Sequence, residues 1–328
     1  MRLQYSFIIL SLIICSSTNA EIITDGTLGQ NINLPGPDFK ITSDIGQQHG
    51  NNLFHSFQDF NLNSSESATF SGPDSVQNIL SRVTGGNPSN IDGLIRSTIL
   101  NADMYFLNPY GIMFGPNAQL DVQGSLHAST ADYLRLGENG RFDARNPSDS
   151  LLTVAPIEAF GFLTNSPATI SMLGSQLAIP SGKTLSLIGG DLMMKKTQLF
   201  APAGQINLTS IKGKGEIIPT DVTALSGDIK ISNNSLLDIS GEGSGNLFIR
   251  AGQFVINSSN IKANSLNKDG GKVSIQANKI HFDGGSRLIG QTKGAGNAAK
   301  IKLQATESTI FSGKSKAGFS SRIDARAY

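Results

Sequence analysis

The sequence has one cysteine, no tryptophan and few charges. Charged residues make up 16% of its 328 positions, against ~25% in an average soluble protein. A single cysteine excludes an internal disulfide framework, and Ile14 before Cys15 is not the small residue that a lipid anchor needs. The shortage of Glu, Lys and Arg excludes coiled coils and helical repeats. Disorder over the whole length is excluded too, because a hydrophobic content of 38% accompanies the low charge.

Long apolar stretches are also missing. The most marked run, residues 7–14, is too short for a membrane-spanning helix, which takes about 20 residues. It follows the positive charge of Arg2 and precedes a small, polar stretch that ends at Ala20. This order is typical of a secretory signal peptide, predicted over residues 1–20 with cleavage between Ala20 and Glu21. The general secretory translocon is therefore an expected partner.

The formal net charge of +1 hides an asymmetry between the two halves of the chain. Residues 21–160 carry 15 acidic and 6 basic side chains, whereas residues 161–328 carry 10 acidic and 19 basic ones. The acidic and the basic half are expected to meet different partners, although a solvated surface would explain either sign. Nucleic acid is not expected among these partners.

Glycine is abundant, with 36 residues, and it separates short alternating segments that repeat near the C-terminus. Residues 245–256 and 271–282 superimpose at an offset of 26, and a third copy begins at residue 300 after a slightly longer step. Within each copy, apolar residues alternate with polar ones, which is the period of a half-buried strand. Leu247 and Val273 occupy equivalent positions in the first two copies.

These repeats predict an all-β architecture built by stacking. One unit cannot bury its apolar row alone, but stacked copies form a continuous core. Short strands within ~20–26 residues are the unit of a parallel β-helix. Leu247, Val273 and Ile301 should therefore form one inward ladder. Residues 74–83 fit a helix or a strand by their spacing, and we assign them to a strand.

The most informative segment is residues 101–118. It consists of an apolar strand over residues 104–107, a tight turn and a second strand over residues 112–114. In the turn Pro109 presets φ, and Gly111 adopts a backbone conformation that other residues resist. The Asn108 side chain is expected to accept a hydrogen bond from the backbone two residues on.

This turn, Asn108-Pro109-Tyr110-Gly111-Ile112, resembles the Asn-Pro-Asn-Gly-Ile motif of the secretion domain of two-partner-secreted exoproteins, the filamentous haemagglutinin N-terminal family. The resemblance covers roughly residues 21–250. Tyr110 departs from the family pattern, and residues 70–73 stand where many relatives have an additional Asn-Pro-Asn-Leu motif. Further blocks that resemble the family lie at residues 53–62, 80–93, 159–163 and 185–191.

The resemblance implies a right-handed, single-stranded parallel β-helix with an N-terminal cap and extra-helical strands. It implies a secretion domain over residues 21–250, followed by further β-helical repeats over residues 251–328. The implied partner is a dedicated outer-membrane transporter with periplasmic POTRA domains, and the implied destination is the cell surface or the medium. The residues implied in secretion and folding are Asn108, Pro109, Gly111 and Ile112 in the turn, and Asn87 and Pro88 in the central block.

No motif in the sequence carries catalytic or metal-binding chemistry. Residues 182–184 and 313–315 resemble the end of a phosphate-binding loop, but the first glycine of such a loop is absent in both cases. Metal-ligand spacing is missing among the four histidines, His49, His55, His127 and His281. We therefore expect no cofactor, no metal and no enzymatic activity.

Three hypotheses about function follow. The favoured one is a secreted or surface-exposed bacterial adhesin of the haemagglutinin type, with glycans of a host or neighbouring cell as candidate ligands. The alternative is a β-helical polysaccharide lyase or hydrolase that acts on acidic glycans; it would need clustered carboxylates, whereas Asp228, Asp238, Asp269 and Asp283 are spaced singly. The third is a truncated larger exoprotein, because relatives carry more repeats and no cap is evident before Tyr328.

Overall fold

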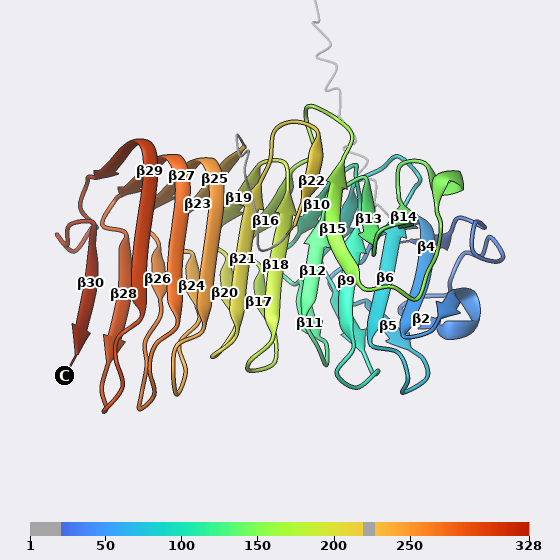
Figure 1. Ribbon diagram of the computed structural model, residues 1–328, viewed down its shortest axis with the longest axis horizontal. Helices are drawn as coiled ribbons and strands as arrows, with labels where there is room; N and C mark the ends of the chain where they lie inside the picture. Colours follow the sequence, from blue (N-terminus) through green and yellow to red (C-terminus); the bar gives the residue numbers. More distant parts are fainter. Residues whose placement is uncertain (1–20, 219–226, 328) are drawn as a thin grey trace, which may run out of the picture.

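The structure, a computed structural model, describes residues 21–218 and 227–327, so the predicted signal peptide with Ala20 lies outside the described residues. The chain winds into stacked coils that run from the N-terminal to the C-terminal end of an elongated body (Figure 1). Each coil contributes short strands to three faces, and equivalent strands of successive coils pair in parallel. The parallel β-helix predicted from the repeats is confirmed.

The first and second faces belong to one sheet, because three long strands bend from one face onto the other. The long strands are β25 (Asn246–Asn257), β27 (Lys272–Asp283) and β29 (Lys300–Phe311). The first face also contains β4 (Asn52–Phe60), β6 (Asn78–Val83), β9 (Asp103–Leu107), β12 (Leu126–Ser129), β18 (Thr184–Gly189) and β21 (Gln205–Ser210). The second contains β7 (Ser89–Ile91), β10 (Ile112–Phe114), β16 (Ile170–Leu173), β19 (Leu192–Lys195) and β23 (Asp228–Ser232).

The third face is formed by two parallel sheets. The N-terminal sheet contains β2 (Asp38–Thr42), β5 (Ser67–Ser71), β8 (Leu94–Ser97) and β11 (Gln119–Asp121). The C-terminal sheet contains β17 (Gln176–Ala178), β20 (Gln198–Phe200), β24 (Leu236–Asp238), β26 (Asn260–Lys262), β28 (Arg287–Thr292) and β30 (Arg322–Ala327).

Antiparallel strands supply the cap and the extra-helical sheet that the resemblance implied. At the N-terminal end β1 (Ile22–Thr24) and β3 (Gln47–His49) both pair antiparallel with β4. The extra-helical sheet contains β13 (Tyr133–Leu136), β14 (Gly140–Asp143), β15 (Ile157–Phe162) and β22 (Gly215–Ile217). The described residues contain no α-helix, and their only helical turns are the 3-10 helices η1 (Ser43–Ile45) and η2 (Pro147–Asp149).

The apolar residues form two cores. The larger one runs along the inside of the coils and follows the inward positions of every face. The smaller one lies between the outer side of the first face and the extra-helical sheet, where Phe54 and Leu80 of the coils meet Phe142 and Phe160. In its N-terminal part the first face is therefore apolar on both sides, which explains why β6 shows no clear alternation in the sequence. Of residues 74–83, which were predicted to form a strand, residues 78–83 form β6, and residues 74–77 lie in the turn and loop before it.

The register of the long strands matches the predicted repeats. Leu247 pairs with Val273 at the offset of 26, and Val273 pairs with Ile301. The ladder that contains Ile249 and Ile275 lies beside it, and both of these side chains are fully buried. The longer step to the third copy arises before β29, because Val273 and Ile301 are already 28 residues apart, and a register shift between Ala277 and Lys279 adds one more residue within the strand. One 12-residue strand replaces two separate strands in each of these coils, because the chain bends without a turn.

A histidine lies within the larger core. The His55 ring of β4 is fully buried, stacked on Phe57 and edge-on to Phe70. Within the described residues neither of its ring nitrogens has a hydrogen-bond partner, and neither has the neighbouring hydroxyl of Ser81. Burial lowers the pKa of His55 to about 4, although Asp44 acts in the opposite direction.

Ile275→Asp should destabilise the protein by several kcal/mol, because it places an unpaired charge inside the larger core. The control is Gln276→Asp, since residue 276 is exposed on the same strand. Urea unfolding of both variants measures the difference. Equal midpoints for the two variants would contradict the inward ladder.

Stability should also fall on acidification. His55 is neutral in the folded state down to a pKa of about 4, whereas the unfolded chain binds this proton near 6.5. Through His55 the folded state therefore loses roughly 3 kcal/mol of stability as pH falls from 6.5 to about 4, and this histidine contributes no further loss below that range. Urea unfolding between pH 7 and 4 measures this slope, and His55→Leu should flatten it. An unchanged slope in His55→Leu would assign the acid sensitivity to other groups.

Candidate functional site

The turn at residues 108–112 connects the first face to the second, between β9 and β10. Asn108 is fully buried. Its Oδ1 accepts a hydrogen bond from the backbone N–H of Tyr110 (2.9 Å), as the sequence predicted, and its carbonyl accepts one from the N–H of Gly111 (3.2 Å). The side chain thus closes its own turn from inside the protein.

The same side chain also holds the preceding coil. Asn108 Nδ2 donates to the carbonyl of Asn87 and to the hydroxyl of Ser89, both at 3.0 Å. In return the N–H of Ser89 donates to the carbonyl of Gly111 (3.0 Å). The structure therefore brings together the two parts of the predicted site, the turn and the central block. We refer to Asn87, Pro88, Ser89 and residues 108–112 as the Asn108 cluster.

Gly111 is required in this cluster for two reasons. Its φ is +126°, a conformation that residues with a side chain rarely adopt. A Cβ at this position would also lie 3.3 Å from the Cβ of Pro88. Ile112, the last residue of the motif, pairs in parallel with Ser89 on one side and with Ile170 on the other, and its side chain is buried in the larger core.

An arginine of the extra-helical segment covers the turn. Arg145 lies over the Tyr110 ring at 5.0 Å and donates to the carbonyl of Pro109 (3.3 Å). It is also paired with Asp132, whose side chain is almost fully buried. Tyr110, the departure from the family motif, is therefore used as a contact between the turn and the extra-helical segment.

A second buried polar group, Arg82 on β6, was not identified as a site residue from the sequence. Its side chain is 1% exposed. Nη1 donates to the carbonyl of Asp143 and to the hydroxyl of Ser150, both at 2.6 Å, and the guanidinium lies 4.6 Å from the centre of the Phe142 ring. These contacts fix the extra-helical segment onto the first face.

Arg82 also contacts the N-terminal cap. Nε donates to Ser56 and Nη2 to Thr27, and both of these hydroxyls donate to Asp25. Burial lowers the pKa of Arg82 to about 10, so the guanidinium stays charged at neutral pH. Burial alone would raise the pKa of Asp25, but hydrogen bonds from Ser56, Thr27 and Thr84 outweigh it and hold this pKa below its usual value. One signal in the sequence pointed to Arg82: it is one of only six cations in the acidic half and lies within the predicted strand at residues 74–83.

The histidines do not form catalytic groups with their neighbours. His281 contacts the hydroxyl of Ser312 (2.7 Å), but that hydroxyl donates its proton to Asp283 (2.8 Å), so the histidine is not placed to remove it. His127 contacts Ser186 (3.0 Å) and stacks on Tyr105, and among the described residues no carboxylate is hydrogen-bonded to its ring. Within residues 21–218 and 227–327 no group of three or more His, Cys, Asp or Glu side chains could hold a metal ion.

The remaining predicted residues lie at the N-terminal end. Glu21, the predicted first residue after cleavage, precedes β1, and its carbonyl accepts the N–H of Asn61 (3.0 Å). The folded chain can therefore begin at Glu21 without losing this cap contact. None of the helical turns described here has the length and apolar character of a membrane span.

The chain is similar to known proteins in sequence and in fold. Over 81 residues the chain is 36% identical to the heme/hemopexin-binding protein of Haemophilus influenzae, an alignment that covers 25% of this chain and 8% of that protein. The aligned segment thus spans less than a tenth of that relative.

Two solved structures are similar in fold. The filamentous hemagglutinin secretion domain aligns with a TM-score of 0.52 at 12% identity, over 94% of this chain and 99% of that chain. The HMW1 secretion domain from Haemophilus influenzae aligns with a TM-score of 0.46 at 18% identity, over 88% and 80%. The family model of the TPS secretion domain matches residues 20–236. The chain therefore belongs to the TPS secretion domain family.

Proposed function

We propose that this protein is a secreted or surface-exposed adhesin-type exoprotein, and that residues 21–250 direct its export through a cognate outer-membrane transporter with periplasmic POTRA domains. Membership in the TPS secretion domain family supports the transporter as a partner. The predicted signal peptide at residues 1–20 supplies the first step, passage through the general secretory translocon. Residues 251–328 add further coils to the same β-helix.

The N-terminal end of the third face offers an edge for the transporter. β2 pairs only with β5 and ends its sheet, so within the described residues its other edge has no strand partner. The carbonyl of Pro37 accepts the N–H of Ser67 on β5. Because the backbone groups of a parallel strand alternate between its two sides, the N–H groups of Asp38 and Lys40 point away from β5. These groups are available for a strand of the receptor domain to add to the sheet.

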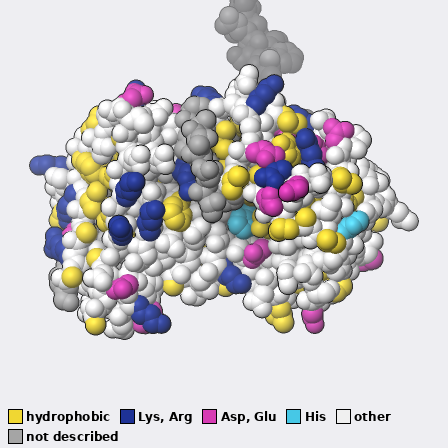
Figure 2. Space-filling model, in the orientation of Figure 1, with side chains coloured by type: hydrophobic (Ala, Val, Ile, Leu, Met, Phe, Trp, Pro, Cys, Tyr) yellow, Lys and Arg dark blue, Asp and Glu magenta, His cyan; other side chains and the backbone are white. Residues whose placement is uncertain are grey.

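The charge distribution also supports the N-terminal end as the part of the protein that meets the transporter. Residues 21–160 carry the net negative charge, and in Figure 2 the Lys and Arg side chains gather mainly over the C-terminal coils. An acidic N-terminal end would be attracted to a basic receptor surface, which raises the rate of encounter.

The Asn108 cluster is proposed to nucleate folding once the chain emerges. A parallel β-helix depends on pairing between distant residues, which makes its folding slow. The cluster joins two successive coils through hydrogen bonds from a single side chain. It therefore sets the register of one coil on the next before later coils are added. Folding outside the cell would then oppose return of the chain.

The alternative function, a lyase or hydrolase for acidic glycans, is not favoured, because the matching family model and the similar solved structure are those of secretion domains. Depolymerisation of polygalacturonate by the purified protein would revive it.

Lys40→Pro should block export, because proline removes the N–H at the free edge of β2. The matched control is Lys40→Gln, which loses the same charge but keeps the N–H. Each variant is co-expressed with the cognate transporter, and the protein is quantified in the medium and the periplasm. We expect Lys40→Pro to accumulate in the periplasm and Lys40→Gln to be exported. Export of a folded Lys40→Pro variant at the normal level would exclude this edge.

Asn108→Ala should destabilise the protein by roughly 2–4 kcal/mol, since the three hydrogen bonds of this buried side chain are lost. Gly111→Val should cost of order 1–3 kcal/mol through its positive φ. Asn117→Ala, which removes an exposed turn asparagine bonded to Asp92, is the control and should cost less than about 1 kcal/mol.

The kinetics of the same variants test nucleation. A folding nucleus requires that Asn108→Ala and Gly111→Val slow refolding of the purified protein more than they accelerate unfolding. If both variants refold normally but no longer bind the isolated receptor domains, the turn is instead a contact for the transporter. Normal refolding and normal binding would leave the cluster a purely structural turn.

A further inference from the structure

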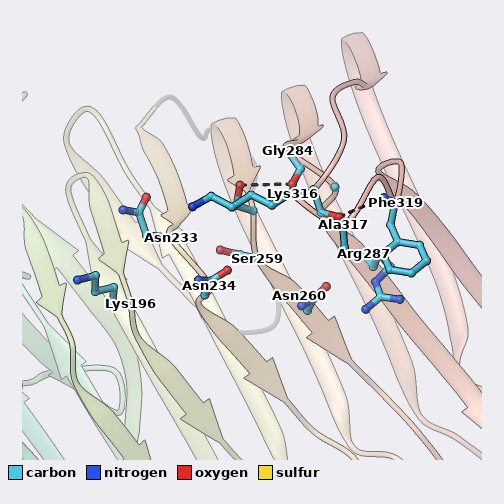
Figure 3. A pocket seen from close by; sticks show the side chains of 13 residues that line it. Lys196, Asn233, Asn234, Ser259, Asn260, Gly284, Arg287, Lys316, Ala317 and Phe319 are labelled. Carbon is cyan, nitrogen blue, oxygen red and sulfur yellow. Dashed lines mark hydrogen bonds between the residues drawn. The ribbon is translucent and has the colours of Figure 1, made fainter.

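A groove runs along the edge between the second and third faces in the C-terminal half of the β-helix. Its volume is about 570 Å³, within the ~300–1,000 Å³ range of ligand sites. Its lining comes from five successive coils, from Lys196 after β19 to the loop at residues 315–319 before β30 (Figure 3). With neighbouring strands ~4.8 Å apart, the groove is roughly 19 Å long. An extended chain molecule fits this shape better than a compact one.

The groove is cationic. Lys196, Arg287 and Lys316 line it, and none of its described lining residues is Asp or Glu. Among the described residues these three cations form no ion pair. The nearest carboxylate in sequence, Asp283, is occupied by hydrogen bonds from Asn257 and Ser312. Positive charge in the groove is therefore left for a ligand.

The rest of the lining offers hydrogen bonds and one aromatic surface. Asn233 and Asn234 lie next to each other in the left-handed region, at φ 61° and 63°. The Oδ1 atom of Asn260 is buried and has no hydrogen-bond partner among the described residues. Phe319 is 53% exposed, and the guanidinium of Arg287 lies 5.8 Å from its ring centre. A carbohydrate site typically combines two kinds of group: amides that bind hydroxyls, and an aromatic ring on which the apolar face of a sugar can pack.

Lys196 is held in a conformation that costs free energy. Its φ is +55°, in the region where asparagine and glycine are favoured over other residues. In the next coil the corresponding turn has Asn233 and Asn234, as steric preference would dictate. A lysine at this position lowers local stability but places a positive charge in the groove. Backbone strain that is retained in this way is typical of functional sites.

We propose that this groove binds an anionic polysaccharide, carboxylated or sulfated, with Lys196, Arg287 and Lys316 on its acidic groups and Phe319 against a sugar ring. Single-stranded nucleic acid is less suited, because binding it depends on several aromatic rings that stack on successive bases, and the described lining of the groove has one. The binding does not depend on the export route, because the groove is formed by the folded protein alone.

The purified protein is titrated with a heparin octasaccharide, with hexagalacturonate and with uncharged maltohexaose, using calorimetry at low and moderate salt. We expect the two acidic oligosaccharides to bind and maltohexaose to bind far more weakly. The ratio between heparin and hexagalacturonate distinguishes sulfate from carboxylate as the preferred group.

The variant combines Lys196→Asn, Arg287→Gln and Lys316→Gln. Asparagine is favoured at φ +55°, so the first substitution should not impair folding. We expect a loss of affinity of about tenfold or more and a salt dependence reduced by up to about three charges. The matched control removes three exposed lysines from the first face, Lys272→Gln, Lys300→Gln and Lys302→Gln, and should keep affinity within about twofold.

Phe319→Ala tests the sugar contact separately and should weaken binding without changing the salt dependence. Equal losses of affinity in the groove variant and in the control would mean that binding depends only on net charge, and this result would overturn the proposal. Absence of saturable binding to both acidic oligosaccharides would overturn it as well. Binding of a dT oligonucleotide as tight as that of heparin, with the same sensitivity to the groove variant, would replace the polysaccharide with nucleic acid.

Discussion

The structure depends on the register of each coil on the one before it. Side chains alternate between the inside and the outside of a strand, so a slip of one residue would turn an entire apolar row outward. From Leu247 through Val273 to Ile301 the register is kept by repetition of the sequence. In the N-terminal coils the sequence does not repeat, and the register there is fixed by buried polar contacts.

Two of these contacts stand out because each joins parts of the chain that are distant in sequence. Asn108 connects its own turn to the previous coil, and Arg82 connects the cap, the first face and the extra-helical segment. Buried polar groups are costly unless all their hydrogen bonds are made, so each accepts few alternative arrangements. An apolar contact in their place would tolerate sliding. These buried polar groups therefore restrict the N-terminal half to one arrangement of its coils.

The sequence predicted those features that are local or periodic. The offset of the repeats, a strand within residues 74–83 and the positive φ of Gly111 follow from alternation and turn chemistry over a few residues. The hydrogen bonds of Asn108 to Asn87 and Ser89 did not follow, because they depend on which coil lies next to which. Arg82 was missed because a cation within a strand is usually exposed, and its burial requires a second layer. The groove beside Lys196 could not be predicted from the sequence, because its lining residues are far apart in the chain and come together only when the coils stack.

The bend of β25, β27 and β29 has a consequence for how such a protein can change over generations. Each of these strands passes from the first face to the second without an intervening loop, so each coil presents nearly the same upper and lower surface to its neighbours. A 26-residue segment could be duplicated or lost in the gene without disturbing the coils on either side. The number of coils could then change between generations while the fold stays the same. Recombination alone could in this way alter how far the molecule projects.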